Sequence, residues 1–167
     1  MKLFPALASL AVLAGMLAPR APRVLSQPEG ADAAEIARVL DDFHDAAAKG
    51  DEERYFAHFT PDAVFLGTDP TERWPLAEFR AWAAPYFERE SAWTYHAVER
   101  HVSVEGEAAW FDEVVRNANY GDLRGTGVLV RRDGAWRIAQ YNLTFQVPND
   151  LADELVKRIR SAAPREP

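Results

Sequence analysis

Two acidic residues between a short strand and a helix could carry chemistry. Asp69 and Glu72 lie three residues apart in the segment Gly67-Thr68-Asp69-Pro70-Thr71-Glu72-Arg73-Trp74. In such a loop the two carboxylates could bind a cation, accept a substrate proton or cap the helix that follows, whose N-terminal dipole favours negative charge. Trp74 would either cover the mouth of a pocket or fix the helix to its preceding loop.

Glu113 is the second acidic candidate. It shares a strand face with Ala109 and Phe111, so its carboxylate lies inside if that face is the core. A shift of one residue would turn Asp112 inward instead. We expect Glu113 to face inward, where desolvation would raise its pKa and make it a general base. The predicted catalytic residues are therefore Glu113 and Asp69.

The segment 134–149 is typical of one long strand with polar residues at alternate positions. Those residues are Gln140, Asn142 and Thr144, on the face of Trp136 and Ile138, whereas Tyr141, Leu143 and Phe145 occupy the opposite face. The polar stripe could hydrogen-bond a carbonyl or hydroxyl group of a ligand, or form a weak oxyanion site. It could also be a buried polar network that fixes the register of the strand.

Arg124 and Thr126 share a face of the preceding strand. A cation beside Glu113 would favour the ionised carboxylate and could anchor an anionic ligand, or Arg124 could form an ordinary surface ion pair. The predicted ligand-binding residues are Glu72, Trp74, Arg124, Thr126, Gln140, Asn142 and Thr144.

The sequence predicts neither a metal site nor a cofactor. There is no cysteine, and His44, His58, His96 and His101 form no pair spaced by four residues. A glycine-rich phosphate loop and a nucleophile elbow are both missing from the sequence, which gives nucleotide binding and serine hydrolysis no support. The net charge of -7 and the scattered Lys and Arg residues argue against nucleic acid as a partner.

The N-terminus predicts export. Lys2 precedes an apolar stretch from Leu3 to Ala18, which has the length of a secretory signal core. We assign residues 1–21 to a signal peptide whose end lies between 18 and 26, and residues 22–31 to a flexible lead-in. The protein would then be periplasmic or secreted, with no stable membrane span after signal removal. The alternative is an uncleaved N-terminal membrane anchor.

Hydrophobic spacing predicts one α+β domain over residues 32–160, followed by a disordered tail over 161–167. The first helix would start after Asp32, capped by Asp32 with Glu35, and stop at Gly50. Further helices are predicted over 51–58, from Pro75 onward with a kink or early end at Pro85, and over 150–160. Strands are predicted over 63–67, 93–104, 108–117, 123–132 and 135–147, and the last four should form an antiparallel meander. The last helix would turn Leu151, Leu155, Val156 and Ile159 inward.

This order of elements resembles the cone of the nuclear transport factor 2 superfamily, in which a curved antiparallel sheet wraps around N-terminal helices and a C-terminal helix follows. The segments Gly67 to Trp74, Ala109-Trp110-Phe111-Asp112-Glu113, Gly125-Thr126-Gly127-Val128-Leu129 and Val147-Pro148-Asn149 are similar to the SnoaL-like branch. The resemblance implies a pocket and a homodimer through the outer face of the sheet. The branch is named after polyketide cyclases that use a His and Asp pair, but Asn142 stands where a titratable His would be expected.

Three functions fit this pattern. The first is an exported module that binds a small, largely apolar molecule in the cone. The second is a cofactor-independent isomerase, dehydratase or cyclase-like enzyme with a pocket carboxylate as general acid or base. The third is a non-catalytic assembly domain in which Tyr141, Leu143 and Phe145 face a partner chain.

Overall fold

The structure is a computed structural model that describes residues 30–162. The predicted signal peptide, nearly all of the predicted lead-in and residues 163–167 lie outside the described residues. Within the described range, no helix is both long and apolar enough to cross a membrane.

Three helices lie in the part of the described chain before residue 88. They are α1 (Ala31–Ala48), α2 (Glu52–Ala57) and α3 (Leu76–Phe87). The predicted capping box is wrong, because α1 begins after Gly30 and Asp32 lies inside the first turn, where it pairs with Arg131. α3 begins at Leu76, one residue after the predicted start at Pro75, and Pro85 does not end the helix before Phe87.

Six strands form one sheet in the order β2-β1-β6-β5-β4-β3. The strands are β1 (Phe59–Leu66), β2 (Arg73–Pro75), β3 (His96–Glu105), β4 (Ala108–Asn117), β5 (Gly121–Arg132) and β6 (Ala135–Phe145). The predicted meander of β3 to β6 is confirmed. The strand β2 was not predicted, and neither was the parallel pairing of β1 with β6.

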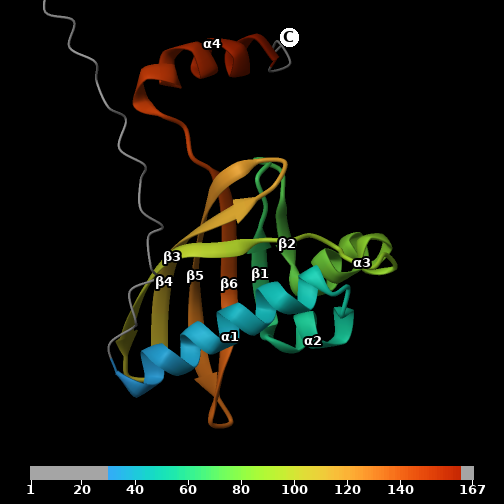
Figure 1. Ribbon diagram of the computed structural model, residues 1–167, viewed down its shortest axis with the longest axis vertical. Coiled ribbons are helices and arrows are strands. Elements are labelled where there is room, and N and C mark those ends of the chain that lie inside the picture. The colour runs from blue at the N-terminus through green and yellow to red at the C-terminus, as the bar shows by residue number, and fades with distance from the viewer. Residues whose placement is uncertain (1–29, 163–167) are drawn as a thin grey trace, which may run out of the picture.

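The helices cover one face of the sheet (Figure 1). α1 crosses the inner face, whereas α2 and α3 lie at the end of the sheet that contains β1 and β2. The core between the layers is rich in aromatic side chains. Phe43 of α1, for example, stacks on Tyr55 with ring centroids 4.4 Å apart, and Phe65 of β1 stacks on Phe79 of α3 at 3.9 Å.

A β-bulge changes which residues of β6 face inward. Leu129 of β5 is opposite Ile138, but the neighbouring Val128 is opposite Gln140, so Ala139 is an extra residue in β6. Before the bulge the buried residues have even numbers, and after it they have odd numbers, as the burial of Ile138 and Tyr141 shows. The prediction that the polar stripe shares a face with Trp136 and Ile138 is therefore wrong.

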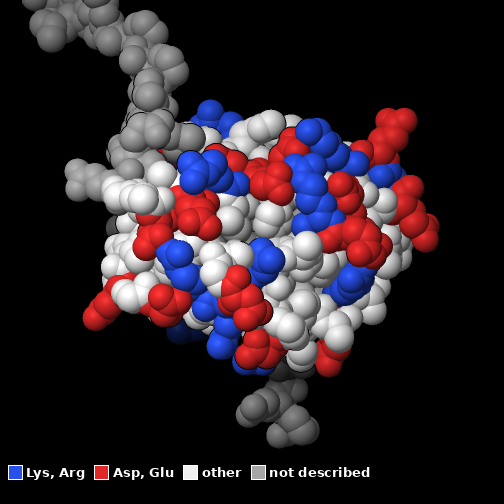
Figure 2. Space-filling view, turned by 90° about the horizontal axis from the view of Figure 1, so that it is seen from below, with Lys and Arg blue, Asp and Glu red and all other residues white. Residues whose placement is uncertain are grey.

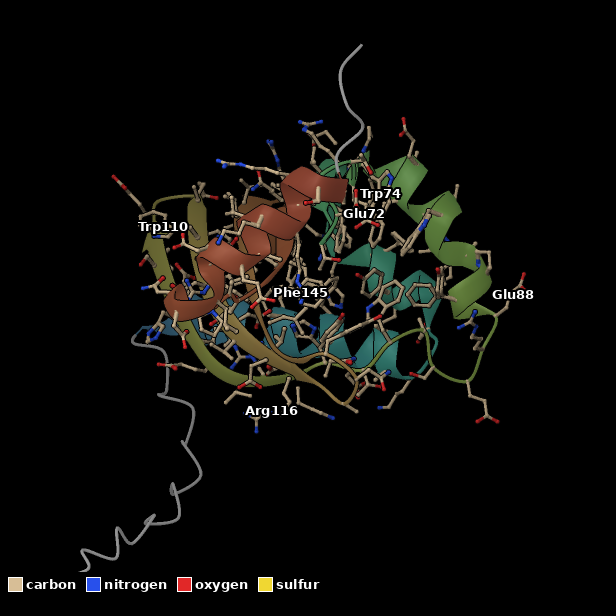
Figure 3. All side chains as sticks on the ribbon, turned by 90° about the horizontal axis from the view of Figure 1, so that it is seen from above. Glu72, Trp74, Glu88, Trp110, Arg116 and Phe145 are labelled. Carbon is tan, nitrogen blue, oxygen red and sulfur yellow. The ribbon has the colours of Figure 1, made fainter. Side chains whose placement is uncertain are left out.

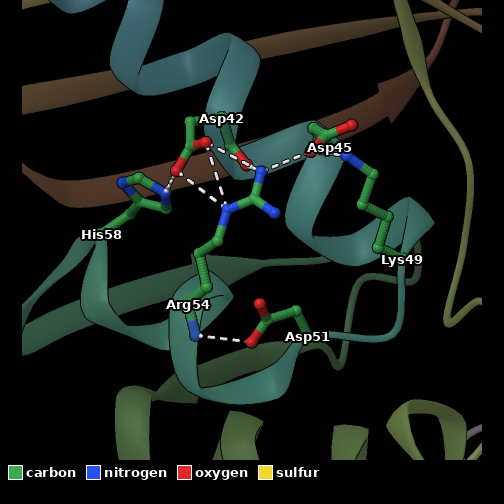
Figure 4. Close-up of polar contacts among 6 residues, drawn as sticks. All are labelled: Asp42, Asp45, Lys49, Asp51, Arg54 and His58. Atoms are coloured by element: carbon green, nitrogen blue, oxygen red, sulfur yellow. Dashed lines mark hydrogen bonds and ion pairs between the residues drawn. The ribbon is translucent and has the colours of Figure 1, made fainter.

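Polar contacts fix the corner between α1 and α2 (Figure 4). The Arg54 side chain donates hydrogen bonds to both carboxylate oxygens of Asp42, at 2.8 Å for the shortest, and also pairs with Asp45. His58 lies 2.8 Å from Asp42 through its Nε2 atom. Burial lowers the pKa of His58, although the nearby Asp42 carboxylate opposes that shift. The cluster thus ties α1 to α2 and to the residue that follows α2.

The C-terminal helix is not packed as predicted. A 3-10 turn, η1 (Asn149–Leu151), leads into α4 (Ala152–Ala162), and no residue of α4 is buried. Leu151, Val156 and Ile159 are all exposed rather than inward. Figure 1 shows α4 standing apart from the sheet, beyond the end of β6.

At position 50, where the chain turns from α1 to α2, the backbone requires a glycine. Its φ is 65°, and an added Cβ would lie 2.5 Å from the Arg89 carbonyl oxygen. Gly106 has a similar φ of 58° with no atom near that position. We expect Gly106→Ala to cost about 1–2 kcal/mol of the free energy of unfolding, and Gly50→Ala clearly more, because it adds a collision with backbone. Urea denaturation measures both, and equal losses would contradict the role of the Arg89 contact.

Candidate functional site

Glu113 of β4 lies at the centre of a buried polar network. Its exposed fraction is 1%, so the predicted inward register is the one that the structure adopts. One carboxylate oxygen, Oε1, accepts a hydrogen bond from the Tyr141 hydroxyl at 2.9 Å and lies 2.8 Å from His44 Nε2. Because an ionised carboxylate can only accept, His44 must carry a proton on Nε2.

The other oxygen of Glu113 is bound by Arg100 of β3. Arg100 Nε donates to Oε2 at 2.8 Å, and Nη2 lies 2.7 Å from the same atom. Its remaining nitrogen, Nη1, donates to the Ala37 carbonyl oxygen at 3.0 Å and to Asp41 at 2.7 Å. The network therefore joins α1, β3, β4 and β6 through one carboxylate.

The pKa of Glu113 is lowered, whereas we expected desolvation to raise it. Burial acts to raise the pKa, as expected from the sequence, but the charges and hydrogen bonds of His44 and Arg100 outweigh it and lower the pKa to about 2. Burial and the neighbouring Glu113 charge together raise the pKa of the Tyr141 hydroxyl well above its usual value. Glu113 is thus an ionised carboxylate with both oxygens occupied, which makes it a poor general base.

A glycine makes room for this network. Gly125 of β5 is directly opposite Glu113, and an added Cβ there would collide with the Tyr141 hydroxyl. The neighbouring Arg124 is exposed and faces away, opposite Val114 and Thr144. Of the two alternatives for Arg124, the position beside Glu113 is therefore excluded, and Arg100 is the cation that lies there.

A cavity of about 980 Å³ lies next to the network, between α3, the ends of β1 and β6, and the turn between β4 and β5. Its lining is mainly aromatic: Phe65, Trp74, Phe79, Trp82, Tyr86, Trp93, Tyr95, Tyr120 and Phe145. Several of these rings are nearly parallel to one another: Phe79 is inclined by 9° to Phe65 and by 12° to Trp74. Trp74 also stacks on Trp82 with centroids 4.7 Å apart. Polar and charged side chains also line it: Thr68, Glu72, Arg89, Thr94, His96, Arg116, Asn117 and Asn119. Small and aliphatic residues complete the lining: Gly67, Ala92, Ala118, Leu123 and Leu143.

The β1–β2 loop brings the predicted site residue Glu72 to this cavity, and β2 brings Trp74 (Figure 3). The Trp74 ring stacks on Phe65 of β1, with ring centroids 6.3 Å apart. Asp69, from the same β1–β2 loop, does not line the cavity. The Asp69 carboxylate accepts hydrogen bonds from the Thr71 hydroxyl at 2.6 Å and from the Thr71 backbone N–H at 2.9 Å, and these bonds lower its pKa. The Asp69 backbone N–H donates to Glu72 at 3.1 Å. Asp69 is therefore part of an exposed turn.

The remaining predicted ligand-binding residues are not in the cavity. Arg124, Thr126, Gln140, Asn142 and Thr144 belong to the side of the sheet that faces away from α1, the outer face. The bulge at Ala139 places Gln140, Asn142 and Thr144 there, and strand pairing puts Thr126 opposite Asn142 and Arg124 opposite Thr144. The same bulge turns Tyr141 and Leu143 into the core and Phe145 toward the cavity, so these residues are not a surface for a partner chain.

His44 and Arg100 were not identified from the sequence as site residues. A signal for His44 was present, because it follows Leu40 by four residues and so lies in the apolar stripe of α1. Arg100 alternates with Val98 and Val102, which also suggests an inward position. A polar residue inside an apolar stripe needs a partner, but the sequence does not show that both converge on Glu113.

Comparison with known proteins agrees with this geometry. The family model of the SnoaL-like domain matches residues 36–148. The chain belongs to the SnoaL-like domain family. The matched range contains every residue of the Glu113 network and of the cavity, whereas α4 lies beyond its end. No curated protein matches the chain.

Solved structures share the fold of this SnoaL-like domain at low sequence identity. An NTF2-like protein of unknown function from Pseudomonas putida has a TM-score of 0.60 and 14% identity, covering 70% of this chain and 87% of that one. A domain of unknown function with a cystatin-like fold from Nostoc punctiforme has a TM-score of 0.58 and 18% identity, covering 77% and 85%. A putative calcium/calmodulin dependent protein kinase II association domain from Xanthomonas campestris has a TM-score of 0.55 and 20% identity, covering 72% and 92%. At such identities these likenesses concern the fold alone.

Replacing the buried carboxylate should change both stability and its pH dependence. Because the pKa of Glu113 is lowered in the folded state, its contribution is present above the ordinary carboxyl pKa and is lost as the pH falls toward 2. Glu113→Gln should cost about 3–5 kcal/mol at neutral pH, since Arg100 is left buried without its partner. It should also flatten the fall in stability between about pH 4.5 and 2.

Asp112→Asn is the matched control for this change, because Asp112 is the exposed neighbour in the same strand. It should alter the free energy of unfolding by less than about 0.5 kcal/mol. Urea denaturation at several pH values measures both variants. If Glu113→Gln retained the acid sensitivity of the parent chain, the low pKa of Glu113 would be refuted.

Proposed function

We propose that this SnoaL-like domain binds a small, largely apolar molecule with an aromatic or otherwise flat portion. The observation that carries this proposal is the cavity of about 980 Å³ with its parallel aromatic rings. This volume is at the upper end of the range of small-molecule sites, which are typically lined by apolar groups with a few polar groups that fix orientation. Flat rings at such walls gain both apolar burial and favourable stacking geometry.

The polar part of the lining would fix the orientation of the ligand. Arg116 donates two hydrogen bonds to Asp122, at 2.6 and 2.9 Å, and its cross-strand neighbour is His96. Arg89 lies over the ring of Tyr86 at 4.9 Å. These groups and the amide of Asn119 offer hydrogen-bond donors in the lining of the cavity, and Glu72 offers an acceptor. The Asn117 amide already donates to the Thr94 carbonyl oxygen at 3.0 Å.

Binding is favoured over catalysis by the state of the two predicted catalytic carboxylates. Glu113 and Asp69 do not line the cavity, and the pKa of each is lowered by its hydrogen bonds and neighbours. An isomerase or dehydratase is the second candidate, because Glu72 is a carboxylate in the lining and His96 is an imidazole there. Under that alternative Glu72→Gln would abolish turnover of the substrate and leave its binding largely intact.

We also propose that the domain is exported and forms a homodimer through the outer face of its sheet. The support for export is the apolar stretch near the N-terminus, which the structure does not describe. The support for the dimer is that Trp110, which is 50% exposed, is directly opposite the exposed Val128 on that face. Large apolar groups that are adjacent on a surface often mark an interface. Figure 2 shows the molecule from below, and on that face acidic and basic side chains are interspersed.

A dye-binding comparison of two tryptophans tests the cavity. Trp82 lines it and is 41% exposed, whereas Trp110 is similarly exposed on the other side of the molecule (Figure 3). The probe is anilinonaphthalene sulfonate, an apolar aromatic anion whose fluorescence rises on binding. Trp82→Ala should weaken its affinity about 3- to 10-fold, because one stacking partner is lost. Trp110→Ala should leave the affinity unchanged, and equal effects of the two changes would refute binding in the cavity.

A charge on the outer face tests the dimer. Val128→Asp should remove the association that this face provides and so lower the sedimenting mass relative to the parent chain, because an unpaired carboxylate would be buried against a second copy. Sedimentation velocity of the parent chain and the variant measures this, and the same subunits weighed by mass spectrometry show whether residues 1–21 have been removed. A parent chain that is monomeric at high concentration would exclude the dimer.

A further inference from the structure

α4 has an apolar stripe that the rest of the described chain leaves uncovered. The stripe consists of Ala152, Leu155, Val156, Ile159 and Ala162. These residues follow one another at intervals of three, one, three and three, which keeps them on one side of the helix. None of them is buried, and only residues 146–148 join η1 and α4 to β6. The helix is thus amphipathic and exposed.

This helix needs a partner for two reasons. It has 11 residues, and helices shorter than about 12–15 residues are marginal in water unless their apolar side is packed. The SnoaL-like match ends at residue 148, so α4 is no part of the matched domain and its stripe does not contribute to that core. The exposed stripe therefore indicates packing against another molecule.

The charges beside the stripe select the partner. Asp153 and Glu154 lie in the first turn of α4, and the basic residues Lys157, Arg158 and Arg160 follow. Successive residues of an α-helix are turned by about 100° around its axis. Asp153 and Arg160 therefore lie within about 20° of each other, on one flank of the stripe. Glu154 and Arg158 lie within about 40° of each other, on the other flank. Each flank thus has an acidic group toward the N-terminus and a basic group toward the C-terminus.

We propose that α4 pairs antiparallel with α4 of a second copy of this chain. Leu155 would pack against the partner's Ile159, with a twofold axis near Val156. In an antiparallel pair, each flank of one helix lies beside the same flank of its partner, and the N-terminal end of one helix lies beside the C-terminal end of the other. Glu154 would therefore face the partner's Arg158 on one flank, and Asp153 would face the partner's Arg160 on the other. A parallel pair would instead place the two acidic turns together. Within one chain Glu154 already bonds Arg158 at 2.7 Å, so the pair needs only small side-chain movements.

An anionic membrane surface fits α4 less well. A helix that lies on such a surface usually has basic residues along its whole polar side. Here the first turn is acidic and would be repelled by anionic headgroups. The contact between α4 helices is also separate from the cavity and from the outer face of the sheet, so it does not depend on the proposed function.

Single cysteines test the pairing directly, because the chain has none. In the full chain, Val156→Cys should form an intermolecular disulfide under mild oxidation, with the rate rising with protein concentration. Lys157→Cys is the matched control, since it is adjacent in sequence but turned away from the stripe, and it should stay reduced. Ala162→Cys should also stay reduced, because in an antiparallel pair its two copies are roughly 16 Å apart, too far for a disulfide.

A second variant separates specific pairing from chance collision. Leu155→Asp with Ile159→Asp, added to Val156→Cys, should abolish the disulfide while leaving the near-ultraviolet circular dichroism of the domain unchanged. The proposal is overturned if Lys157→Cys cross-links as fast as Val156→Cys, or if Ala162→Cys cross-links and Val156→Cys does not. It is also overturned if Val156→Cys stays reduced but the chain sediments with phosphatidylglycerol vesicles, which would assign the stripe to a lipid surface.

Discussion

The fold depends on one buried negative charge. A carboxylate removed from water is tolerated only when cations and hydrogen-bond donors surround it, and Glu113 obtains both from elements that are distant in sequence. His44 fixes the position of α1, Arg100 that of β3, and Tyr141 that of β6 after its bulge. Sliding any of these elements would remove a partner from the buried Glu113 carboxylate. The network thus specifies how the helix layer sits on the sheet, beyond what apolar packing alone would require.

The same charge separates stability from function in this domain. A general base should bind a proton strongly enough to take one up from the substrate near neutral pH, and it should reach the substrate. Glu113 fails on both counts, because its pKa is lowered to about 2 and its two oxygens are occupied by protein groups. The cavity next to it is bounded by Phe65, Tyr95 and Leu143 on the side of the core, and its own walls are mainly aromatic. The strongest polar cluster of the described residues thus lies outside the cavity and acts on packing, while Glu72 and His96 are titratable side chains in the cavity lining that remain for chemistry.

Much of the fold could be predicted from the sequence, whereas the site could be predicted only in part. Periodicity located α1, α2, α3 and the four strands of the meander, because each pattern is local and set by burial on one side. Ala109, Phe111 and Glu113 gave the correct register of β4 for the same reason. The bulge at Ala139 has no local signal, and it exchanged the two faces of β6 for every residue that follows. The partners of Glu113 come from 13 to 69 residues away, and such pairing depends on tertiary structure.

The network and the cavity occupy different parts of the scaffold, so the lining of the cavity can change without disturbing the buried charge. The network ties the middle of β4 and β6 to α1, whereas the cavity is built from α3, the loop before β3, the turn between β4 and β5, and the end of β6. Loops and strand ends tolerate substitution because few core contacts depend on them. Trp82, Tyr120 and Phe145 are each more than one third exposed, so replacing them changes the shape of the cavity and removes little from the core. Ligand preference can therefore change while the buried charge, and with it the packing of α1 on the sheet, stays the same.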